Sequence, residues 1–228
     1  MKTLAASLSI LTKQGVMLYL LRGVAFTCII SVLGVIMGLI VGSLLALART
    51  YCKKGPSRIL GWFATAYIEL FRNTPLLIQL FFFYFGLPRM GFSITPEVCG
   101  MVGLALHGGA YMAESFRAGL ENVEPIQRES AISLGLSKLQ SMRYVVLPQA
   151  FSLSFPSFVA NVIFLLKETS VFSAISLMDL MFTAKDLIGL YYKTTEALFL
   201  LVVFFALYRY NAVIITSILR VCTSILSF

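Results

Sequence analysis

Charged residues are scarce in this sequence. Asp, Glu, Lys and Arg make up 12% of its 228 residues and hydrophobic residues make up 59%, whereas a soluble domain carries about 25% charged residues. This scarcity argues against a disordered chain and a cytosolic enzyme. The net charge is +8, but Lys and Arg form no run of the kind that binds nucleic acid. The composition therefore predicts a polytopic membrane protein without a nucleic-acid partner.

Residues that carry catalysis or hold metals are also few. The one histidine, His107, and the four cysteines, Cys28, Cys52, Cys99 and Cys222, show no CxxC or Cys–His spacing, so neither a metal site nor a disulfide framework is indicated. No nucleotide-binding GxxxxGK loop and no HExxH or GxSxG motif occurs. We therefore expect no catalytic residue, no metal, no cofactor and no enzymatic activity in this chain. If the chain takes part in active transport, the energy has to come from an ion gradient or a partner.

The sequence contains several apolar stretches that are long enough to cross a membrane. A transmembrane helix needs about 20 mostly apolar residues, and the candidates are Val16 to Ala48, Ile59 to Leu87, Val98 to Phe116, Phe151 to Leu166 with a ragged continuation, and Ala197 to Ile218. The predicted fold class is all-α, a polytopic membrane protein with five transmembrane helices. Residues 1–15 precede the spans as a retained segment, residues 16–220 form the transmembrane domain, and residues 221–228 form a tail.

The distribution of Lys and Arg predicts the orientation of the chain. One side of the predicted spans holds nine of them: Arg49, Lys53, Lys54, Arg58, Arg117, Arg128, Lys138, Arg143 and Arg220. The other side holds five: Lys2, Lys13, Arg89, Lys185 and Lys193. Because cytoplasmic loops carry an excess of Lys and Arg, the first set is expected in the cytoplasm. The amino-terminal segment is then extracytoplasmic and the tail is cytoplasmic.

A stripe of small residues lies within the first span. Gly34, Gly38 and Gly42 recur every fourth residue on one helical face. Glycine lets helix backbones approach closely, and such packing stabilises helix pairs in lipid, where the hydrophobic force between helices is missing. The stripe predicts a tight contact with another helix or another subunit. The alternative is background glycine in a membrane helix.

Two charges in the second span are expected to pair. Glu69 and Arg72 are three residues apart on one helical face, and a charge at the centre of a span costs about 2.5–3.5 kcal/mol unless it finds a partner or water. The following Asn73-Thr74-Pro75 interrupts the helix, because proline lacks a backbone donor. We expect a structural kink anchored by this pair. Lining a transport pathway is the alternative.

A second polar interruption follows the fourth apolar stretch. Lys167-Glu168-Thr169-Ser170 lies about 18 residues after Gln149, or about 27 Å along a helix, which is the middle to outer part of a membrane. Such a break predicts a helix interruption facing a cavity, as transporters use for substrates. An interfacial helix end is the alternative. Ser173 to Leu187 is too short and polar to cross again, and predicts a bent or half-inserted helix.

The longest polar segment, Arg117 to Pro148, has apolar residues at helical spacing. Within it, Gln127 to Leu134 predicts a short helix, and Gly135 suits its carboxyl-terminal cap. Lys138 to Leu147 predicts a second helix that ends before Pro148, which can start the next span. A short helix presented on a glycine turn is suited to docking with a partner. A solvated loop is the alternative.

The spacing Glu-small-Ala-x3-Gly-x9-Val-x-Leu-Pro, from Glu129 to Pro148, resembles the EAA loop of permease subunits in bacterial ATP-binding-cassette (ABC) importers. Ser130 stands where alanine is usual, which is a small-for-small change. Three more strings narrow the resemblance to the polar amino acid permeases, the histidine/glutamine/arginine group. They are Tyr67 to Leu80, with Asn73 in place of the usual glycine, Gly109 to Leu120, and Leu166 to Ser170. The tail lacks the cluster of basic and acidic residues common in the group, which leaves Arg209 unexplained.

The resemblance implies the transmembrane domain of a type I ABC importer, with a MetI-like fold, in the bacterial cytoplasmic (inner) membrane. Two copies, or two related chains, would surround a central path. Two ATPase subunits, which bind ATP and Mg, would dock in the cytoplasm, and an extracytoplasmic solute-binding protein would deliver the amino acid. The coupling loop would cover about residues 121–148.

By position, the resemblance assigns the coupling helix to Glu129, Ser130, Ala131, Gly135 and Leu136. Glu129 is expected to supply a polar or charged contact to the ATPase, and Gly135 the turn. Ser130 and Ala131 are small enough for close contact with the partner.

The substrate class implies a second group of residues. A free amino acid carries an ammonium and a carboxylate, so a site within the membrane would offer an acid, hydroxyls and amide or backbone groups. The candidates are Asn161, Glu168, Thr169 and Ser170, with Glu114 and Asp179 as outer candidates. Asn161 and Glu168 are seven residues apart and share a face if the helix is unbroken. The alternative is that these groups serve only packing or gating.

Other functional classes compete with the ABC permease. An ion-coupled secondary transporter or channel would use the intramembrane charges without an ATPase, but no inverted repeat is visible by eye. The sequence lacks the catalytic constellation that a membrane enzyme would need. An assembly scaffold would need no such constellation. We therefore expect the permease subunit of an ATP-driven importer for a polar amino acid.

Overall fold

The computed structural model describes residues 15–52, 55–192, 194–204, 206–207 and 210. Among these residues the regular structure is helical and no strand occurs, so the predicted all-α class is confirmed. They divide into two compact units, which are described separately. The first unit contains the described residues of Met1–Ile36, Thr74–Ala105 and Ile163–Ile214, and the second those of Met37–Asn73 and Leu106–Val162.

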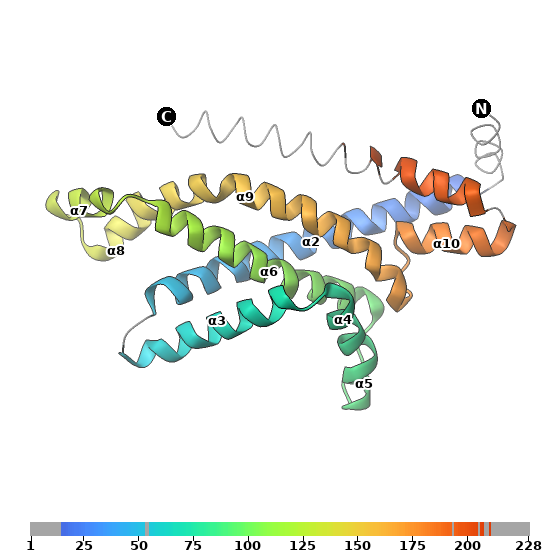
Figure 1. Ribbon diagram of the computed structural model, residues 1–228, viewed down its shortest axis with the longest axis horizontal. Coiled ribbons are helices and arrows are strands. Elements are labelled where there is room, and N and C mark those ends of the chain that lie inside the picture. Colours follow the sequence, from blue (N-terminus) through green and yellow to red (C-terminus); the bar gives the residue numbers. More distant parts are fainter. Residues whose placement is uncertain (1–14, 53–54, 193, 205, 208–209, 211–228) are drawn as a thin grey trace. The chain divides into compact units, whose positions relative to one another are not determined.

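The helices follow one another without intervening sheets (Figure 1). In chain order they are α2 (Val16–Tyr51), the 3-10 helix η1 (Gly55–Ser57), α3 (Arg58–Asn73), α4 (Leu76–Phe81), the π-helix η2 (Phe82–Gly86), α5 (Leu87–Arg89), α6 (Pro96–Asn122), α7 (Pro125–Ser133), α8 (Lys138–Ser141), the π-helix η3 (Met142–Val146), α9 (Leu147–Glu168), the 3-10 helix η4 (Thr169–Ile175) and α10 (Leu180–Tyr191). A further helix covers Thr194–Phe204. The end of the fifth predicted span, Arg209 and the tail lie outside the described residues.

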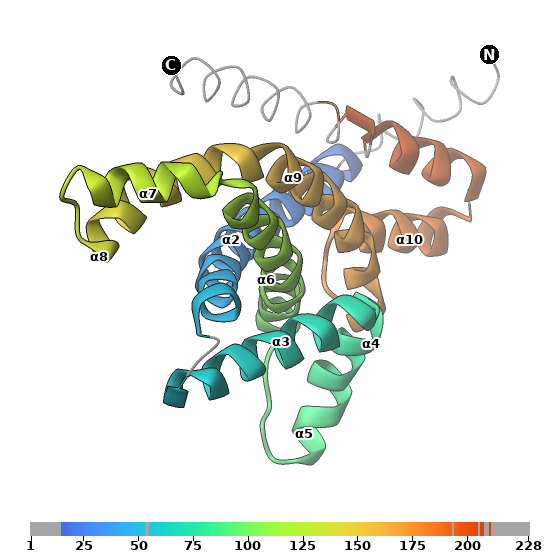
Figure 2. The same ribbon diagram turned by 60° about the vertical axis from the view of Figure 1, so that its left-hand side comes forward.

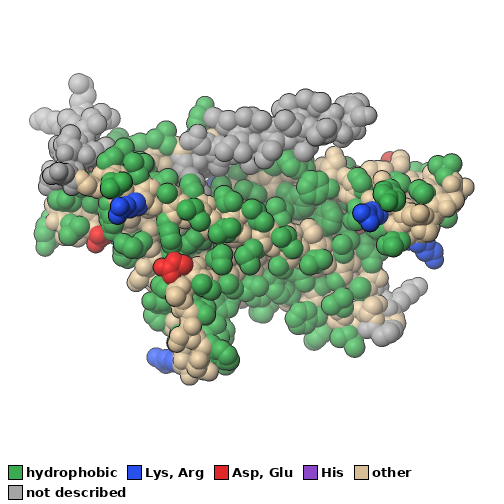
Figure 3. All heavy atoms as spheres, turned by 180° about the vertical axis from the view of Figure 1, so that it is seen from behind, with side chains coloured by type: hydrophobic (Ala, Val, Ile, Leu, Met, Phe, Trp, Pro, Cys, Tyr) green, Lys and Arg blue, Asp and Glu red, His purple; other side chains and the backbone are tan. Residues whose placement is uncertain are grey.

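Two helical paths are long and apolar enough to cross a membrane by themselves. Among the described residues these are Val16–Tyr51 and Lys138–Ile175, and Arg58–Asn73 with Leu76–Arg89 would make a third, broken span. α6 has 27 residues but is not among these apolar paths, and it carries His107 and Glu114. Hydrophobic side chains predominate on the face seen in Figure 3. The chain is therefore a helical, multi-span membrane protein.

Three prolines lie where the helices break or widen, whereas Pro156 lies inside α9. α3 ends at Asn73 and α4 begins after Pro75, as expected for a residue without a backbone donor. Each π-helix comes directly before a Leu-Pro pair, and in the second pair Leu147 N–H donates to Met142 O. This wider turn accommodates the proline ring without ending the helix. α9 begins at Leu147, so Pro148 lies in the first turn of this helix as predicted. The predicted helix end before Pro148 is wrong, because the helical path from Lys138 to Ile175 continues through the proline.

In the first unit, α10 packs beside the beginning of α2. The shared hydrophobic core consists of Val16, Leu20, Leu180, Leu187, Ala197 and Leu200. Asp179 begins α10 as its amino-terminal cap, accepting the Phe182 N–H at 2.8 Å. Of the predicted bent helix from Ser173 to Leu187, the first residues lie in η4 and the last lie in α10, with an interruption before Leu180.

In the second unit, close helix packing depends on small residues. A Cβ atom on Gly42 of α2 would lie 2.7 Å from Gly109 O of α6, and one on Gly119 of α6 would lie 2.5 Å from Ala150 O of α9. In the first unit, Gly34 packs against the Leu104 side chain in the same way. Gly34 and Gly42 of the glycine stripe therefore serve helix contacts within the chain.

Candidate functional site

The α7–α8 turn is built around a glycine cap. Gly135 has φ +87°, in the left-handed region that glycine adopts without a Cβ penalty. Its N–H donates to Ile132 O at 2.9 Å, and Leu136 N–H donates to Ala131 O at 3.1 Å. This pair of hydrogen bonds is a Schellman motif, which satisfies the last carbonyls of α7. The predicted short helix with a glycine cap is confirmed.

A second cap begins α8. Ser137 Oγ accepts the Gln140 N–H at 3.3 Å, while Ser137 N–H donates to Gln140 Oε1 at 2.9 Å. This is a capping box, which satisfies two backbone donors reciprocally. The turn lies in the second unit, between the end of α6 and the beginning of α9 (Figures 1 and 2).

Exposure along α7 corrects one expectation. Glu129 and Ser130 are exposed, but Ala131 is only 4% exposed. The Ala131 side chain is therefore packed within this chain and is not presented to a partner. Sequence reasoning missed Leu134 and Leu139, which are 85% and 77% exposed. The hydrophobic periodicity of the sequence does not mark these two leucines, because both lie at helix ends beside the turn. Exposed leucines of this kind are typical of an interaction surface.

Three arginines and three glutamates form an ionic cluster in the second unit, with balanced charge. The members are Arg49 of α2, Glu69 and Arg72 of α3, and Glu114, Arg117 and Glu121 of α6. Glu114 lies at its centre: Arg49 Nη1 is 2.9 Å and Arg72 Nη1 is 3.8 Å from its Oε2, while Arg117 contacts its Oε1. Because guanidinium groups engage both of its oxygens, the geometry favours a structural role for Glu114.

The expected ion pair between Glu69 and Arg72 is replaced by pairs with other helices. Among the ion pairs of the described residues, Glu69 pairs with Arg49 at 3.5 Å and Arg72 pairs with Glu114. The Arg72 guanidinium also lies over the Tyr111 ring, 5.6 Å from its centroid. Opposite charges on adjacent helices compete with the partner on the same helix, so the two residues connect α3 to α2 and α6.

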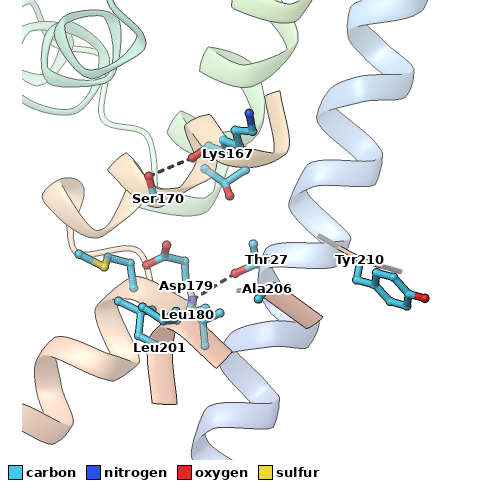
Figure 4. Close-up of a pocket in the computed structure, with 11 residues that line it drawn as sticks. Thr27, Lys167, Ser170, Asp179, Leu180, Leu201, Ala206 and Tyr210 are labelled. Atoms are coloured by element: carbon cyan, nitrogen blue, oxygen red, sulfur yellow. Dashed lines mark hydrogen bonds between the residues drawn. The ribbon is translucent and has the colours of Figure 1, made fainter. Parts of the chain in front are cut away.

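A cavity of about 680 Å³ lies in the first unit (Figure 4). Its lining consists of Thr27, Lys167, Thr169, Ser170, Asp179, Leu180, Met181, Leu201, Val202, Ala206 and Tyr210. Hydroxyls, one ammonium and one carboxylate therefore gather at a cavity that is otherwise apolar. This is the usual composition of a small-molecule site.

Backbone contacts hold the polar groups of the cavity in place. Thr27 Oγ1 donates to Gly23 O at 2.8 Å and accepts the Leu180 N–H at 3.1 Å. Ser170 Oγ donates to Lys167 O at 2.9 Å. In Figure 4, Lys167 and Ser170 lie on one side of the cavity, and Thr27 and the cap residue of α10 lie on the other.

The polar run after Leu166 does not stop the helical path but changes its type, since α9 ends at Glu168 and the 3-10 helix η4 follows directly. Thr169, Ser170 and Asp179, three of the six substrate candidates, meet at the cavity, but Glu168 is not part of its lining.

Asn161 and Glu114 belong to the second unit. Asn161 Nδ2 donates to Ser115 Oγ at 2.8 Å and Tyr111 O at 3.2 Å. Asn161 and Glu168 do share an unbroken helix, α9, but that helix contributes to both units, so the two residues meet different neighbours.

Sequence reasoning did not single out Thr27 or Lys167 as site residues. Thr27 is an isolated hydroxyl in a long apolar helix, and only its contact with α10 reveals its place at the cavity. Among the described residues, no three His, Cys, Asp or Glu side chains gather as metal ligands.

Residues 34–224 match the family described as "Binding-protein-dependent transport system inner membrane component". The chain belongs to this family. It is 39% identical over 165 residues to a Rickettsia prowazekii (strain Madrid E) protein named as a glutamine transport system permease, GlnP, covering 72% of this chain and 74% of that protein. It is 39% identical over 164 residues to the arginine transport system permease protein ArtQ of Bacillus subtilis (strain 168), covering 72% and 73%.

Solved structures agree with this assignment. A crystal structure of an amino acid ABC transporter with histidines matches with a TM-score of 0.84 and 30% identity, over 93% of this chain and 96% of that one. The methionine ABC transporter MetNI, in an inward-facing form, matches with a TM-score of 0.65 at 23% identity, which shows the fold alone. The MetI-like fold and the resemblance to permease subunits of polar amino acid ABC importers are confirmed, and these relatives are transport subunits.

Proposed function

We propose that this chain is the membrane subunit through which an ATP-driven importer moves a polar amino acid supplied by an extracytoplasmic binding protein. The observation that carries the proposal is the pairing of an exposed, glycine-capped α7 with a separate cavity that offers both charges of an amino acid. The relatives named for glutamine and arginine transport support the substrate class.

Coupling is assigned to the α7–α8 turn. Two ATPase subunits, which hold ATP and Mg²⁺, dock on this turn, one on each of two permease chains. Glu129 and Ser130 supply polar contacts, Leu134 and Leu139 enter an apolar groove, and Gly135 sets the turn. A conformational change is transmitted only if the ATPase binds the two orientations of the permease with different free energies. A rigid, doubly capped turn transmits such a difference without local unfolding.

Leu134→Ser tests the docking surface. Docking would bury the Leu134 side chain in the ATPase groove, and losing the burial of a leucine costs about 1.5–3 kcal/mol. The ATPase chain should therefore bind at least roughly tenfold more weakly. Leu190→Ser, at an exposed leucine of α10 in the first unit, should bind the ATPase as wild type does. Co-purification with the ATPase, titrated by salt, measures this. Equal binding by both variants would refute the docking assignment.

Substrate contact is assigned to the cavity of the first unit. In this proposal Asp179 accepts the ammonium of an amino acid and Lys167 donates to its carboxylate, and Thr27, Thr169 and Ser170 offer hydroxyl groups. The support is that all five residues line the cavity. The apolar wall suits the aliphatic part of the substrate. Glu168, Asn161 and Glu114 then serve packing or gating, consistent with their places outside this lining.

Asp179→Asn separates this assignment from one based on Glu168. Asparagine keeps the cap of α10 but removes the charge, and a lost charged hydrogen bond of about 1.5 kcal/mol raises the KM for uptake roughly tenfold. Glu168→Gln should stay within about twofold of wild type. Uptake into proteoliposomes that contain the ATPase and binding protein measures both. A larger effect of Glu168→Gln would overturn the cavity assignment, and uptake without any ATPase would favour the ion-coupled alternative.

Orientation completes the proposal. Docking of α7 in the cytoplasm places the amino-terminal segment outside the cell and the carboxyl terminus inside, as the Lys and Arg distribution predicts. The chain then lies in the cytoplasmic membrane of a bacterium beside a second permease chain, which is identical or related.

A further inference from the structure

A second cavity, of about 410 Å³, lies in the second unit and is rich in arginine. Its lining consists of Arg49, Cys52, Arg58, Gly61, Trp62, Thr65, Arg117 and Glu121. Three guanidinium groups therefore face a single carboxylate. The cavity belongs to neither the α7–α8 turn nor the proposed amino acid site.

Arg58 supplies the charge that no described residue compensates by an ion pair. Arg49 and Arg117 are held by carboxylates of the ionic cluster. Arg58, by contrast, makes no ion pair with any described residue. A guanidinium offers a planar fork of donors that matches the oxygens of a phosphate. The free charge of the cavity thus fits an anionic ligand.

The α3 wall of the cavity continues into an apolar surface. Trp62 lies one turn after Arg58 on α3, and Trp62 and Ile59 are 72% and 75% exposed. Phe63 is exposed beside them. Tryptophan is enriched where the acyl region of a membrane meets the headgroups. An acyl chain lying along Ile59 and Phe63 would bring its headgroup beside Arg58.

We infer that this cavity binds the phosphate headgroup of an anionic phospholipid such as phosphatidylglycerol. Basic pockets between membrane helices are suited to such headgroups. Phosphatidylcholine has the same phosphate but adds a cation, which Arg58 repels, so the anionic lipid is preferred. The inference requires only that the chain lies in a membrane, and it is independent of the substrate and ATPase assignments.

The fluorescence of Trp62 tests the inference directly, because it is the only tryptophan in the sequence. The full-length chain is placed in phosphatidylcholine bilayers that contain a fixed fraction of dibrominated phosphatidylglycerol or dibrominated phosphatidylcholine. Wild type should associate with the glycerol lipid about fivefold more strongly, since one basic residue near a membrane contributes about that factor. In Arg58→Gln the ratio should fall to about one.

A matched control separates the cavity from general surface charge. Arg143→Gln removes an exposed arginine of the same unit that does not line the cavity, and it should keep the fivefold ratio. Thr65→Glu adds a carboxylate to the lining and should lower the ratio to one or below, which provides a second test if Arg58→Gln does not fold.

Three outcomes would overturn the inference. The first is equal quenching by both lipids in wild type. The second is an equal loss in Arg58→Gln and Arg143→Gln, since the preference would then reflect overall charge. The third is loss of the preference when inorganic phosphate replaces chloride at constant ionic strength, because free phosphate would then be the ligand. An unchanged preference in phosphate supports the lipid.

Discussion

At the scale of single residues, Glu114 illustrates how a membrane protein accommodates charge. Its carboxylate contacts guanidinium groups from α2, α3 and its own helix α6. Removing one member of such a cluster leaves its partners uncompensated in a region of low dielectric, which costs more than the pair contributes. The cluster therefore holds three helices of the second unit together.

Glu114→Gln should destabilise the protein, because three arginines would then face two carboxylates. The expected loss is about 2 kcal/mol, which lowers the apparent melting temperature in detergent by roughly 5 °C. Glu97→Gln makes the same change on the same helix, at an exposed residue without an ion pair among the described residues. It should melt within about 1 °C of wild type, and equal shifts for the two variants would contradict a structural role for Glu114.

At the scale of elements, the conformation of Gly135 determines how α7 is presented. Its positive φ lets the chain reverse and brings two N–H groups onto the last carbonyls of α7. Open space surrounds the position where a Cβ would stand. Glycine is therefore required at this position for its backbone conformation, and not because a side chain would lack space.

Gly135→Val and Gly135→Asn separate these two requirements. A β-branched residue in the left-handed region costs about 1–2 kcal/mol, whereas asparagine tolerates it. We expect Gly135→Val to reduce ATP-driven uptake roughly tenfold, and Gly135→Asn to retain most of it. ATPase stimulation by the binding protein and amino acid provides the measurement. Similar activity of the two variants would mean that the cap does not set the coupling geometry.

At the scale of the whole molecule, small residues determine where helices can meet. Membrane helices lack a hydrophobic force between them, so close packing has to stabilise their contacts. In the second unit, α2 and α6 meet at Gly42, where backbone atoms of α6 leave no space for a side chain. This contact sets the distance between the helices that carry the ionic cluster.

Gly42→Ala should therefore weaken the packing of the second unit. The added methyl would lie 2.7 Å from Gly109 O and from Met112 Cβ, and overpacking of this kind costs about 1–3 kcal/mol. Gly189→Ala places the same methyl in open space on α10 and should be neutral or slightly stabilising. Melting in detergent compares them, and a neutral Gly42→Ala would show that the helices can separate without loss.

Local sequence patterns were sufficient for features that depend on neighbours along the chain. Apolar length predicted the helices of α2 and α9. Gly135 predicted the end of α7, and the polar run after Leu166 predicted the end of α9. Each depends on hydrogen bonds or burial within a few residues, so a pattern in one window of sequence contains the necessary information.

The tertiary structure alone decided which distant groups meet. Glu69 and Arg72 suit one another by spacing, but adjacent helices supply their partners. Thr27 reaches the cavity through a hydrogen bond to Leu180, 153 residues away. The physical reason is that a polar group in a membrane must find some partner, while the choice among partners depends on which helices approach closely. The sequence by itself determined that the few charges had to be compensated, and the packing of the helices determined by which groups.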